Sequence, residues 1–157
     1  MKLLADKLSE EQAKELTSWH YPEEYSIYNL PSWEIIVQKN YSLADSIKRE
    51  KYIGYMNDAG ELVGFVNLSL TKEDTVFFGI GVNPKYCDMG VGKTITKMAL
   101  IESQKRFPNK PVVLEVRTWN KRAINCYKSQ GFEIIGTTQQ ETYAGEGEFY
   151  IMRYTGN

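Results

Sequence analysis

The sequence CDMGVGKT, residues 87–94, decides the fold of this chain. It follows the apolar run at residues 75–82, which predicts a strand, and it precedes residues 95–106, whose pattern predicts a helix. A glycine-rich turn at the start of a helix presents unpaired backbone N–H groups, and the helix dipole favours negative charge there. Glycine also lets the backbone approach a ligand closely. We therefore expect Gly90 and Gly92 to lie against the phosphate groups of a ligand.

Two common nucleotide-binding motifs do not fit this loop. A P-loop requires a glycine five residues before Gly92, and the sequence has Cys87 at that position. A dinucleotide fingerprint that begins at Gly90 requires a small residue where the sequence has Ile95. The loop therefore predicts a phosphorylated ligand but disfavours a nucleotide-binding protein of either kind.

Composition excludes several other classes of protein. With 157 residues the chain is expected to form one domain, residues 1–157, and its 19 basic and 20 acidic residues give a net charge of −1, which disfavours a nucleic-acid partner. Two cysteines and one histidine make neither a disulfide framework nor a metal site. Residues 1–7 lack the apolar core of a signal peptide, and no stretch approaches the ~20 apolar residues of a membrane span. We expect a cytoplasmic protein with no metal and no membrane partner.

Periodicity, capping residues and turn signals outline the order of helices and strands. Helices are expected at residues 8–17, 32–39, 92–106 and 120–129, and strands at residues 52–56, 62–70, 75–82, 112–116, 132–139 and 149–154. Residues 57–60 read as a hairpin turn, residues 145–147 as the turn between the last two strands, and residues 19–28 as an aromatic loop or short helix. This order predicts a mixed α/β sandwich with helices on both faces of the sheet.

A second motif identifies a family. The sequence EVRTWNKRAINCY, residues 115–127, is followed by Gly131-Phe132. Together with the first loop it resembles the two acetyl-CoA segments of the GNAT superfamily of N-acyltransferases, whose second segment carries Asn, Ala and Tyr at the positions of Asn120, Ala123 and Tyr127. The first segment departs from the family pattern at Cys87, where the family has Gln or Arg.

This resemblance implies a fold and an activity. The fold is an α/β GNAT-like mixed, mostly antiparallel sheet with a splayed central strand pair and helices on both faces. The activity is transfer of the acetyl group from acetyl-CoA to a primary amine, on a small molecule or a protein N-terminus, by direct attack. In its cofactor motifs the chain resembles the ribosomal-protein N-terminal acetyltransferase type. A non-catalytic acyl-CoA sensor or assembly module is the alternative, and a homodimer is left open.

The resemblance also implies which residues bind the coenzyme. The pantetheine arm is expected along Ile80, Gly81 and Val82, where a free N–H group would stabilise the oxyanion of the intermediate. The pyrophosphate is expected over Asp88, Met89, Gly90, Val91, Gly92 and Lys93. Asn120 matches the position that hydrogen-bonds the coenzyme arm. Because a cradle built from backbone N–H groups needs no particular side chain, Cys87 is compatible with this interpretation.

Two residues are candidates for proton transfer. Tyr127 is the candidate general acid, because a phenol of pKa ~10 can donate a proton over a short distance to the departing thiolate, whose thiol has a pKa of ~8.5. Its alternative role is packing of a helix on the sheet. Glu115 is the candidate general base, acting through water. Its alternative role is a structural ion pair with Arg117, which lies two residues further along the same strand face.

The acceptor amine is expected near the N-terminal aromatic segment. Trp19, Tyr21, Tyr25 and Tyr28 are the candidate substrate-binding residues, and the three tyrosines have the spacing of one helical face. Such rings bind a cationic amine through cation–π contacts. The alternative is that they pack the helices on the sheet. Tyr143, in a late loop, is a further candidate for the pocket wall. The sequence does not identify the acceptor.

Overall fold

The computed structural model describes residues 2–142 and 145–156, so the prediction for Tyr143 lies outside the described residues. The chain divides into two compact units, described separately below. The first unit comprises residues 1–66 and 81–91, and the second comprises residues 67–80 and 92–157. The expectation of a single domain over residues 1–157 stays a prediction.

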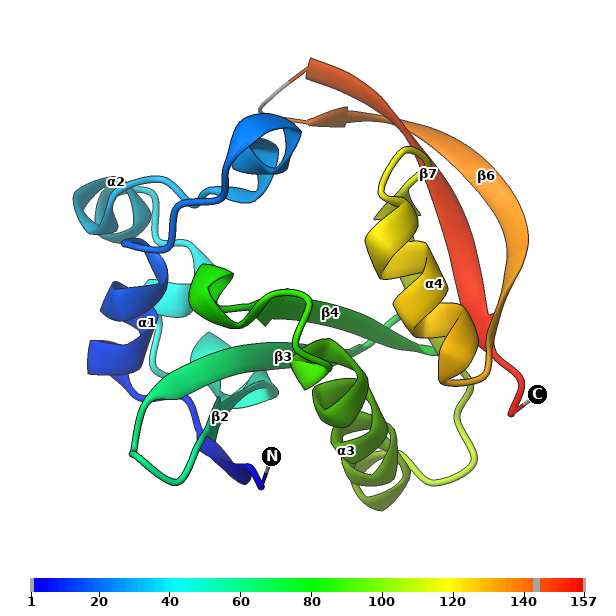
Figure 1. The fold of residues 1–157 in the computed structure, drawn as a ribbon, viewed down its shortest axis with the longest axis horizontal. Helices are drawn as coiled ribbons and strands as arrows, with labels where there is room; N and C mark the ends of the chain where they lie inside the picture. The colour runs from blue at the N-terminus through cyan, green and yellow to red at the C-terminus, as the bar shows by residue number, and fades with distance from the viewer. Residues whose placement is uncertain (1, 143–144, 157) are drawn as a thin grey trace. The chain divides into compact units, whose positions relative to one another are not determined.

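Seven strands hydrogen-bond in the order β1-β2-β3-β4-β5-β7-β6. Figure 1 labels β2, β3, β4, β6 and β7 on the ribbon. The bounds of the strands are β1 Leu4–Lys7, β2 Tyr52–Met56, β3 Leu62–Leu70, β4 Val76–Val82, β5 Val112–Arg117, β6 Phe132–Thr142 and β7 Gly145–Tyr154. Strands β4 and β5 run parallel, whereas β1–β2, β5–β7 and β6–β7 are antiparallel pairs. The predicted mixed, mostly antiparallel sheet is confirmed.

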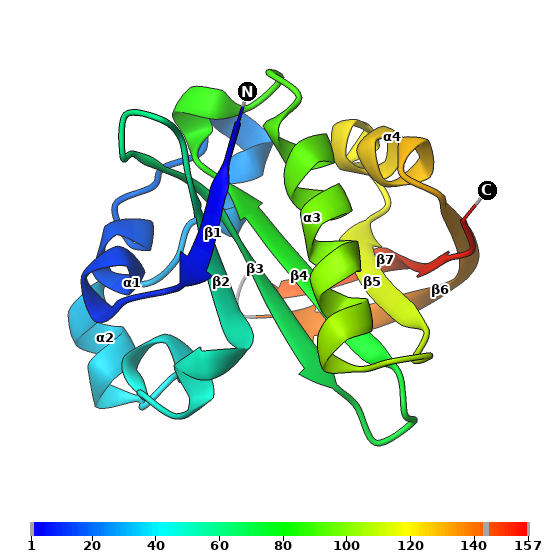
Figure 2. The same cartoon turned by 90° about the horizontal axis from the view of Figure 1, so that it is seen from below.

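The first unit contains β1 and β2, the first part of β3, the end of β4 and several short helices, with β1, β2 and β3 side by side in Figure 2. Three of these helices lie between β1 and the segment that leads to β2. These three are α1 (Glu10–Leu16), η1 (Glu23–Tyr28) and α2 (Trp33–Gln38). Helix α1 begins as the sequence predicts, because the Ser9 hydroxyl accepts a hydrogen bond from the Gln12 N–H group and the Gln12 side chain bonds the Ser9 N–H group. Buried leucines, Trp19, Ile36 and Tyr52 form the core of this unit.

The second unit is built around β5, β6 and β7 and the two longer helices. These helices are α3 (Val91–Arg106), whose residues from Gly92 onward belong to this unit, and α4 (Lys121–Ser129). Three aromatic rings form its core: Phe78 of β4, Tyr127 of α4 and Phe132 of β6, with ring centroids 5.9–6.4 Å apart. Helix α4 is followed by Gly131, whose φ of +98° belongs to the left-handed region that glycine adopts without strain. Across the described part of the chain, every helix is too short or too polar to cross a membrane.

Two differences from the predicted elements have physical causes. Strand β1 has four exposed residues, so its sequence carries no apolar alternation, and its pairing with β2 through backbone hydrogen bonds defines it. Residues 145–147, predicted as a turn, belong to β7 and pair with the end of β6. Glycines in a hairpin indicate a turn from sequence, but here the antiparallel ladder continues through them.

One glycine of β4 is required by a close contact. A Cβ atom at Gly81 would lie 2.2 Å from the ring of Phe65, a distance that real Cβ atoms do not reach. Phe65 itself contacts the rings of Trp19 and Tyr52, each with a centroid distance of 6.1 Å. The packing of Phe65 against Trp19 and Tyr52 therefore requires glycine at position 81.

We expect Gly81→Ala to lower the free energy of unfolding by about 1–3 kcal/mol, because the Phe65 ring must move away from its neighbours. Gly79→Ala is the matched control in the same strand, since its Cβ would meet Asn67 at an ordinary 3.7 Å. Urea unfolding of both variants measures the difference. Adding Phe65→Leu to Gly81→Ala should recover part of the loss, and equal stabilities of the two alanine variants would contradict this account.

Candidate active site

The β4–β5 ladder is short. It joins Val76 to Val112 and Phe77 to Val113, and both strands continue beyond these pairs. The register therefore ends before either strand does, as expected for the splayed pair that the resemblance implies. Ile80, Gly81 and Val82, the residues predicted to follow the pantetheine arm, form the end of β4, and all three are partly exposed.

The predicted phosphate loop has the backbone of an open turn. Asp88 and Gly90 have φ values of +65° and +79°, and residues 88–90 are exposed. A Cβ atom at Gly90 would meet no atom within 4 Å, so the space beside this glycine is open. Helix α3 begins directly afterwards at Val91, which is buried, and Lys93 in its first turn is exposed. The sequence prediction placed the loop and the helix start correctly.

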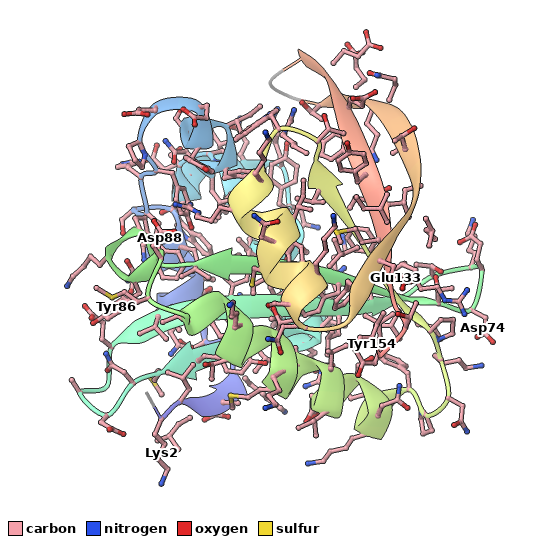
Figure 3. All side chains as sticks on the ribbon, turned by 45° about the vertical axis from the view of Figure 1, so that its right-hand side comes forward. Lys2, Asp74, Tyr86, Asp88, Glu133 and Tyr154 are labelled. Atoms are coloured by element: carbon pink, nitrogen blue, oxygen red, sulfur yellow. The ribbon has the colours of Figure 1, made fainter. Side chains whose placement is uncertain are left out.

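Hydrogen bonds to the β2–β3 hairpin hold the segment that precedes this loop. The short helix η4 (Pro84–Tyr86) follows β4, and Figure 3 labels Tyr86 and Asp88 on this segment. The Glu61 carboxylate accepts hydrogen bonds from the Tyr86 hydroxyl and, at 2.9 Å, from the Lys85 ammonium. The hydrogen bond from Tyr86 is the main cause that lowers the pKa of Glu61, and the bond from Lys85 is the second cause. The bond between Tyr86 and Glu61 also raises the pKa of Tyr86.

Asn83 is a second anchor of the same segment. Its buried side chain donates to the Leu62 carbonyl at 3.0 Å and accepts from the Lys85 N–H group at 3.0 Å. Its backbone N–H group donates to the Val63 carbonyl at 2.9 Å. Sequence reasoning missed this support for the phosphate loop. The asparagine before Pro84, a turn signal, was the only local indication of it.

Tyr127 lies in the core of the second unit with 8 % of its surface exposed. Its ring meets the edge of Phe78 at a centroid distance of 6.4 Å and that of Phe132 at 5.9 Å. The predicted packing role of the ring is therefore present. These ring contacts also hold the Tyr127 hydroxyl in one position, and a proton donor must be held in this way.

Glu115 has an exposed side chain on β5, between the buried residues Leu114 and Val116. Within residues 2–142 and 145–156, Glu115 makes no ion pair with Arg117. The alternative role of Glu115, a structural ion pair with Arg117, is therefore not present: the Arg117 guanidinium lies 4.7 Å from the centroid of the Phe149 ring. An exposed carboxylate is accessible to water, as a base that acts through water requires.

Asn120 is the N-cap of α4. Its buried side-chain oxygen accepts a hydrogen bond from the Ala123 N–H group at 3.2 Å. This bond explains the asparagine of the motif, because an N-cap side chain bonds the backbone N–H group of the third helical residue. The cap orients the start of the helix that carries Tyr127.

The four aromatic candidates for the acceptor have different environments. Trp19 is 6 % exposed and packs in the core of the first unit, as the alternative interpretation predicts. Tyr21 precedes η1, so the three tyrosines do not share one helix, and its hydroxyl donates to the Val82 carbonyl at 2.7 Å. Tyr25 is half-buried and Tyr28 is exposed, both on η1. Tyr21 thus ties the aromatic segment to the end of β4 within the first unit.

Comparison with known proteins gives the family and the fold. The model of the acetyltransferase (GNAT) family matches residues 10–132. Over 106 residues the chain is 30% identical to N-alpha-acetyltransferase RimI of Mycobacterium tuberculosis, covering 65% of this chain and 64% of that protein. Over 82 residues it is 34% identical to peptidyl-lysine N-acetyltransferase YiaC of Escherichia coli, covering 52% and 50%. The chain thus spans about half to two thirds of the length of these curated relatives.

Solved structures share the fold at low sequence identity. A chimera of spermidine N-acetyltransferase SpeG from Vibrio cholerae and hSSAT superposes with a TM-score of 0.77 at 17% identity, covering 98% of this chain and 95% of that one. The ribosomal-protein-S18-alanine N-acetyltransferase of Escherichia coli superposes with a TM-score of 0.68 at 19% identity, covering 98% and 93%. The matched segment contains both predicted coenzyme motifs and the splayed strands, and the chain belongs to the acetyltransferase (GNAT) family.

Proposed function

We propose that this chain is an N-acetyltransferase that moves the acetyl group of acetyl-CoA to a primary amine. The observation that carries the proposal is the open turn at Gly90, directly before the 16-residue helix α3, in a chain that belongs to this family. A helix of this length has a strong dipole, and the exposed backbone before it suits an anion. The pyrophosphate of the donor would bind residues 88–93, chiefly through backbone N–H groups.

The remaining donor contacts follow from the strand and the second motif. The end of β4, from Ile80 to Val82, would bind the pantetheine arm through backbone groups, and one of its N–H groups would stabilise the oxyanion. Asn120 would contact the same arm in addition to capping α4. Lys93, exposed in the first turn of α3, would add a cationic contact to a phosphate.

The chemical step is direct attack of the amine on the thioester carbonyl. The amine nitrogen forms a C–N bond to the carbonyl carbon, and the carbonyl electron pair moves to the oxygen to give a tetrahedral oxyanion. When this intermediate collapses, the C–S bond breaks and its electron pair leaves on the coenzyme sulfur. Glu115, through water, would accept the proton that the amine loses, and Tyr127 would donate the proton that the departing thiolate takes up. This division of roles uses one exposed carboxylate and one phenol held by its ring contacts.

The acceptor is an amine, and the relatives' names include acceptors as different as peptidyl-lysine and spermidine. Tyr21, Tyr25 and Tyr28 are the proposed contacts for it in the first unit, and Trp19 would support them from the core. Activity in the cytoplasm and assembly as a homodimer both stay predictions. Fractionation and light scattering measure them.

Gly90→Glu should weaken acetyl-CoA binding by more than tenfold, because an anionic side chain would enter the open space beside the turn. Gly60→Glu is the matched control: its φ of +77° imposes the same backbone strain on the β2–β3 turn, outside the loop. Calorimetry with acetyl-CoA on both folded variants measures the effect. Equal affinities of the two variants would refute the assignment of the pyrophosphate, as would tight binding of ATP by the unmodified protein.

Tyr127→Phe should lower turnover by ~10²-fold or more with little change in coenzyme affinity, because phenylalanine keeps the ring contacts and removes the proton donor. Release of coenzyme thiol, followed under conditions where chemistry limits the rate, measures turnover. Tyr25→Phe is the control and should change the KM for the acceptor more than kcat. Unchanged turnover of Tyr127→Phe would leave this residue with its packing role alone.

Cys87→Ala and Cys126→Ala should both retain substantial turnover, because direct attack needs no acyl-enzyme. Burial raises the pKa of the Cys126 thiol despite opposing effects of Lys93 and Thr96, so the reactive thiolate is disfavoured there. The Cys87 thiol donates a weak hydrogen bond to the Asn83 carbonyl at 3.8 Å. Mass spectrometry after mixing with acetyl-CoA tests the point, and an acetyl-cysteine that passes its acetyl group to the acceptor would contradict it.

A further inference from the structure

Arg117, at the end of β5, is a cation with few partners for its charge. It is 8 % exposed, its guanidinium lies 4.7 Å from the Phe149 ring, and one nitrogen donates to the Thr142 hydroxyl at 3.3 Å. Among residues 2–142 and 145–156, no carboxylate lies within ion-pair distance of it. A guanidinium has five N–H donors, and burying its charge is costly unless an anion or several acceptors compensate. The guanidinium is therefore suited to accept an anion from outside the chain.

The sequence makes room for the guanidinium in this position. A Cβ atom at Gly147 would lie 2.3 Å from one guanidinium nitrogen of Arg117, so any other residue there would displace the charged group. Strand β7 thus brings its bare backbone against the guanidinium, and Phe149, two residues further on, covers its face. Contacts between β5 and β7 therefore fix the position of the Arg117 guanidinium, unlike that of a flexible side chain on the surface.

The proposed general base lies on the same face of β5. Residues two apart in a strand share a face and are separated by roughly 7 Å, so Glu115 and Arg117 present opposite charges side by side without pairing with each other. Their partners across the antiparallel ladder, Ile151 and Phe149, are uncharged. A ligand with an ammonium group and a carboxylate a few bonds apart would match both charges at once.

We propose that Arg117 selects an acceptor that carries a carboxylate a few bonds from its reactive amine, such as a free amino acid or an acidic first residue of a peptide. This inference rests on the proposed acetyl transfer. The Arg117 guanidinium binds the carboxylate as a two-pronged donor, and this contact holds the amine toward Glu115. A polyamine would instead place a second cation beside Arg117, which disfavours that class of acceptor.

The test compares acceptors that differ in one charge. Peptides that begin with Glu or Gln are matched in shape and in amine basicity, and alanine with alaninamide supplies the free amino acid. The unmodified protein should show a kcat/KM at least about tenfold higher for the carboxylate member of at least one pair, and Arg117→Gln should abolish that preference through KM. The responding pair identifies a peptide or a free amino acid as the source of the carboxylate.

Two control variants separate a binding role from a structural one. Arg117→Lys keeps the charge but loses the fork, so it should restore part of the preference. Arg153→Gln removes an exposed cation opposite Val113 on the same sheet face and should leave the preference unchanged. A preference that survives in Arg117→Gln, or an unmodified protein that prefers the uncharged members or spermidine, would overturn the inference.

A binding measurement distinguishes failure of this inference from failure of the proposed activity. If no amine releases coenzyme thiol, the acetyl transfer itself is wrong. Calorimetry with N-acetylglutamate and its uncharged diamide then decides the role of Arg117 without turnover. Binding of N-acetylglutamate that the diamide does not share and that Arg117→Gln loses supports the anion site. Equal binding of the two compounds, or no binding, refutes it.

Discussion

The early end of the β4–β5 ladder is the structural feature from which the proposed chemistry follows. Parallel strands that stop pairing leave backbone N–H and C=O groups that require partners, because an unpaired buried backbone group costs about as much as a lost hydrogen bond. After Val76–Val112 and Phe77–Val113 the register stops, while β4 continues through Gly79 and Ile80. A thioester arm with amide groups is a ligand that can supply such partners. The end of the ladder therefore supports the proposed binding site at this position.

A binding site made of backbone needs a backbone that stays in place. In the first unit, the β2–β3 hairpin supplies Glu61 for the Tyr86 hydroxyl and the Leu62 carbonyl for the Asn83 side chain. These bonds hold the residues immediately before the exposed turn at Asp88 and Gly90. The turn can be open and strained because its preceding segment is anchored. Tolerance of Cys87 in place of the usual Gln or Arg is consistent with such a design, since the anchors lie elsewhere.

In the second unit, the two proposed proton-transfer residues have different environments. Tyr127 is held by Phe78 and Phe132, so its ring is part of the core. Glu115, in contrast, is exposed and makes no ion pair among the described residues. Arg117 is buried against Phe149 and Gly147, which keeps it from neutralising Glu115. Glu115 and Arg117 therefore lie on one strand face without pairing with each other.

Elements with local signals could be predicted from the sequence. The hairpin turn at residues 57–60 located β2 and β3, Ser9 and Asn120 identified the starts of α1 and α4, and the glycines of residues 87–94 located the start of α3. Features that depend on contacts between distant residues required the tertiary structure. They are the exposed strand β1, the hydrogen bond from Tyr86 to Glu61, and the packing of Arg117 over Phe149, which decides against the alternative ion pair with Glu115. Neighbouring residues in the sequence indicate the backbone conformation of a residue. The contacts of a charged side chain such as that of Arg117 depend instead on which strand lies next to it in the folded chain.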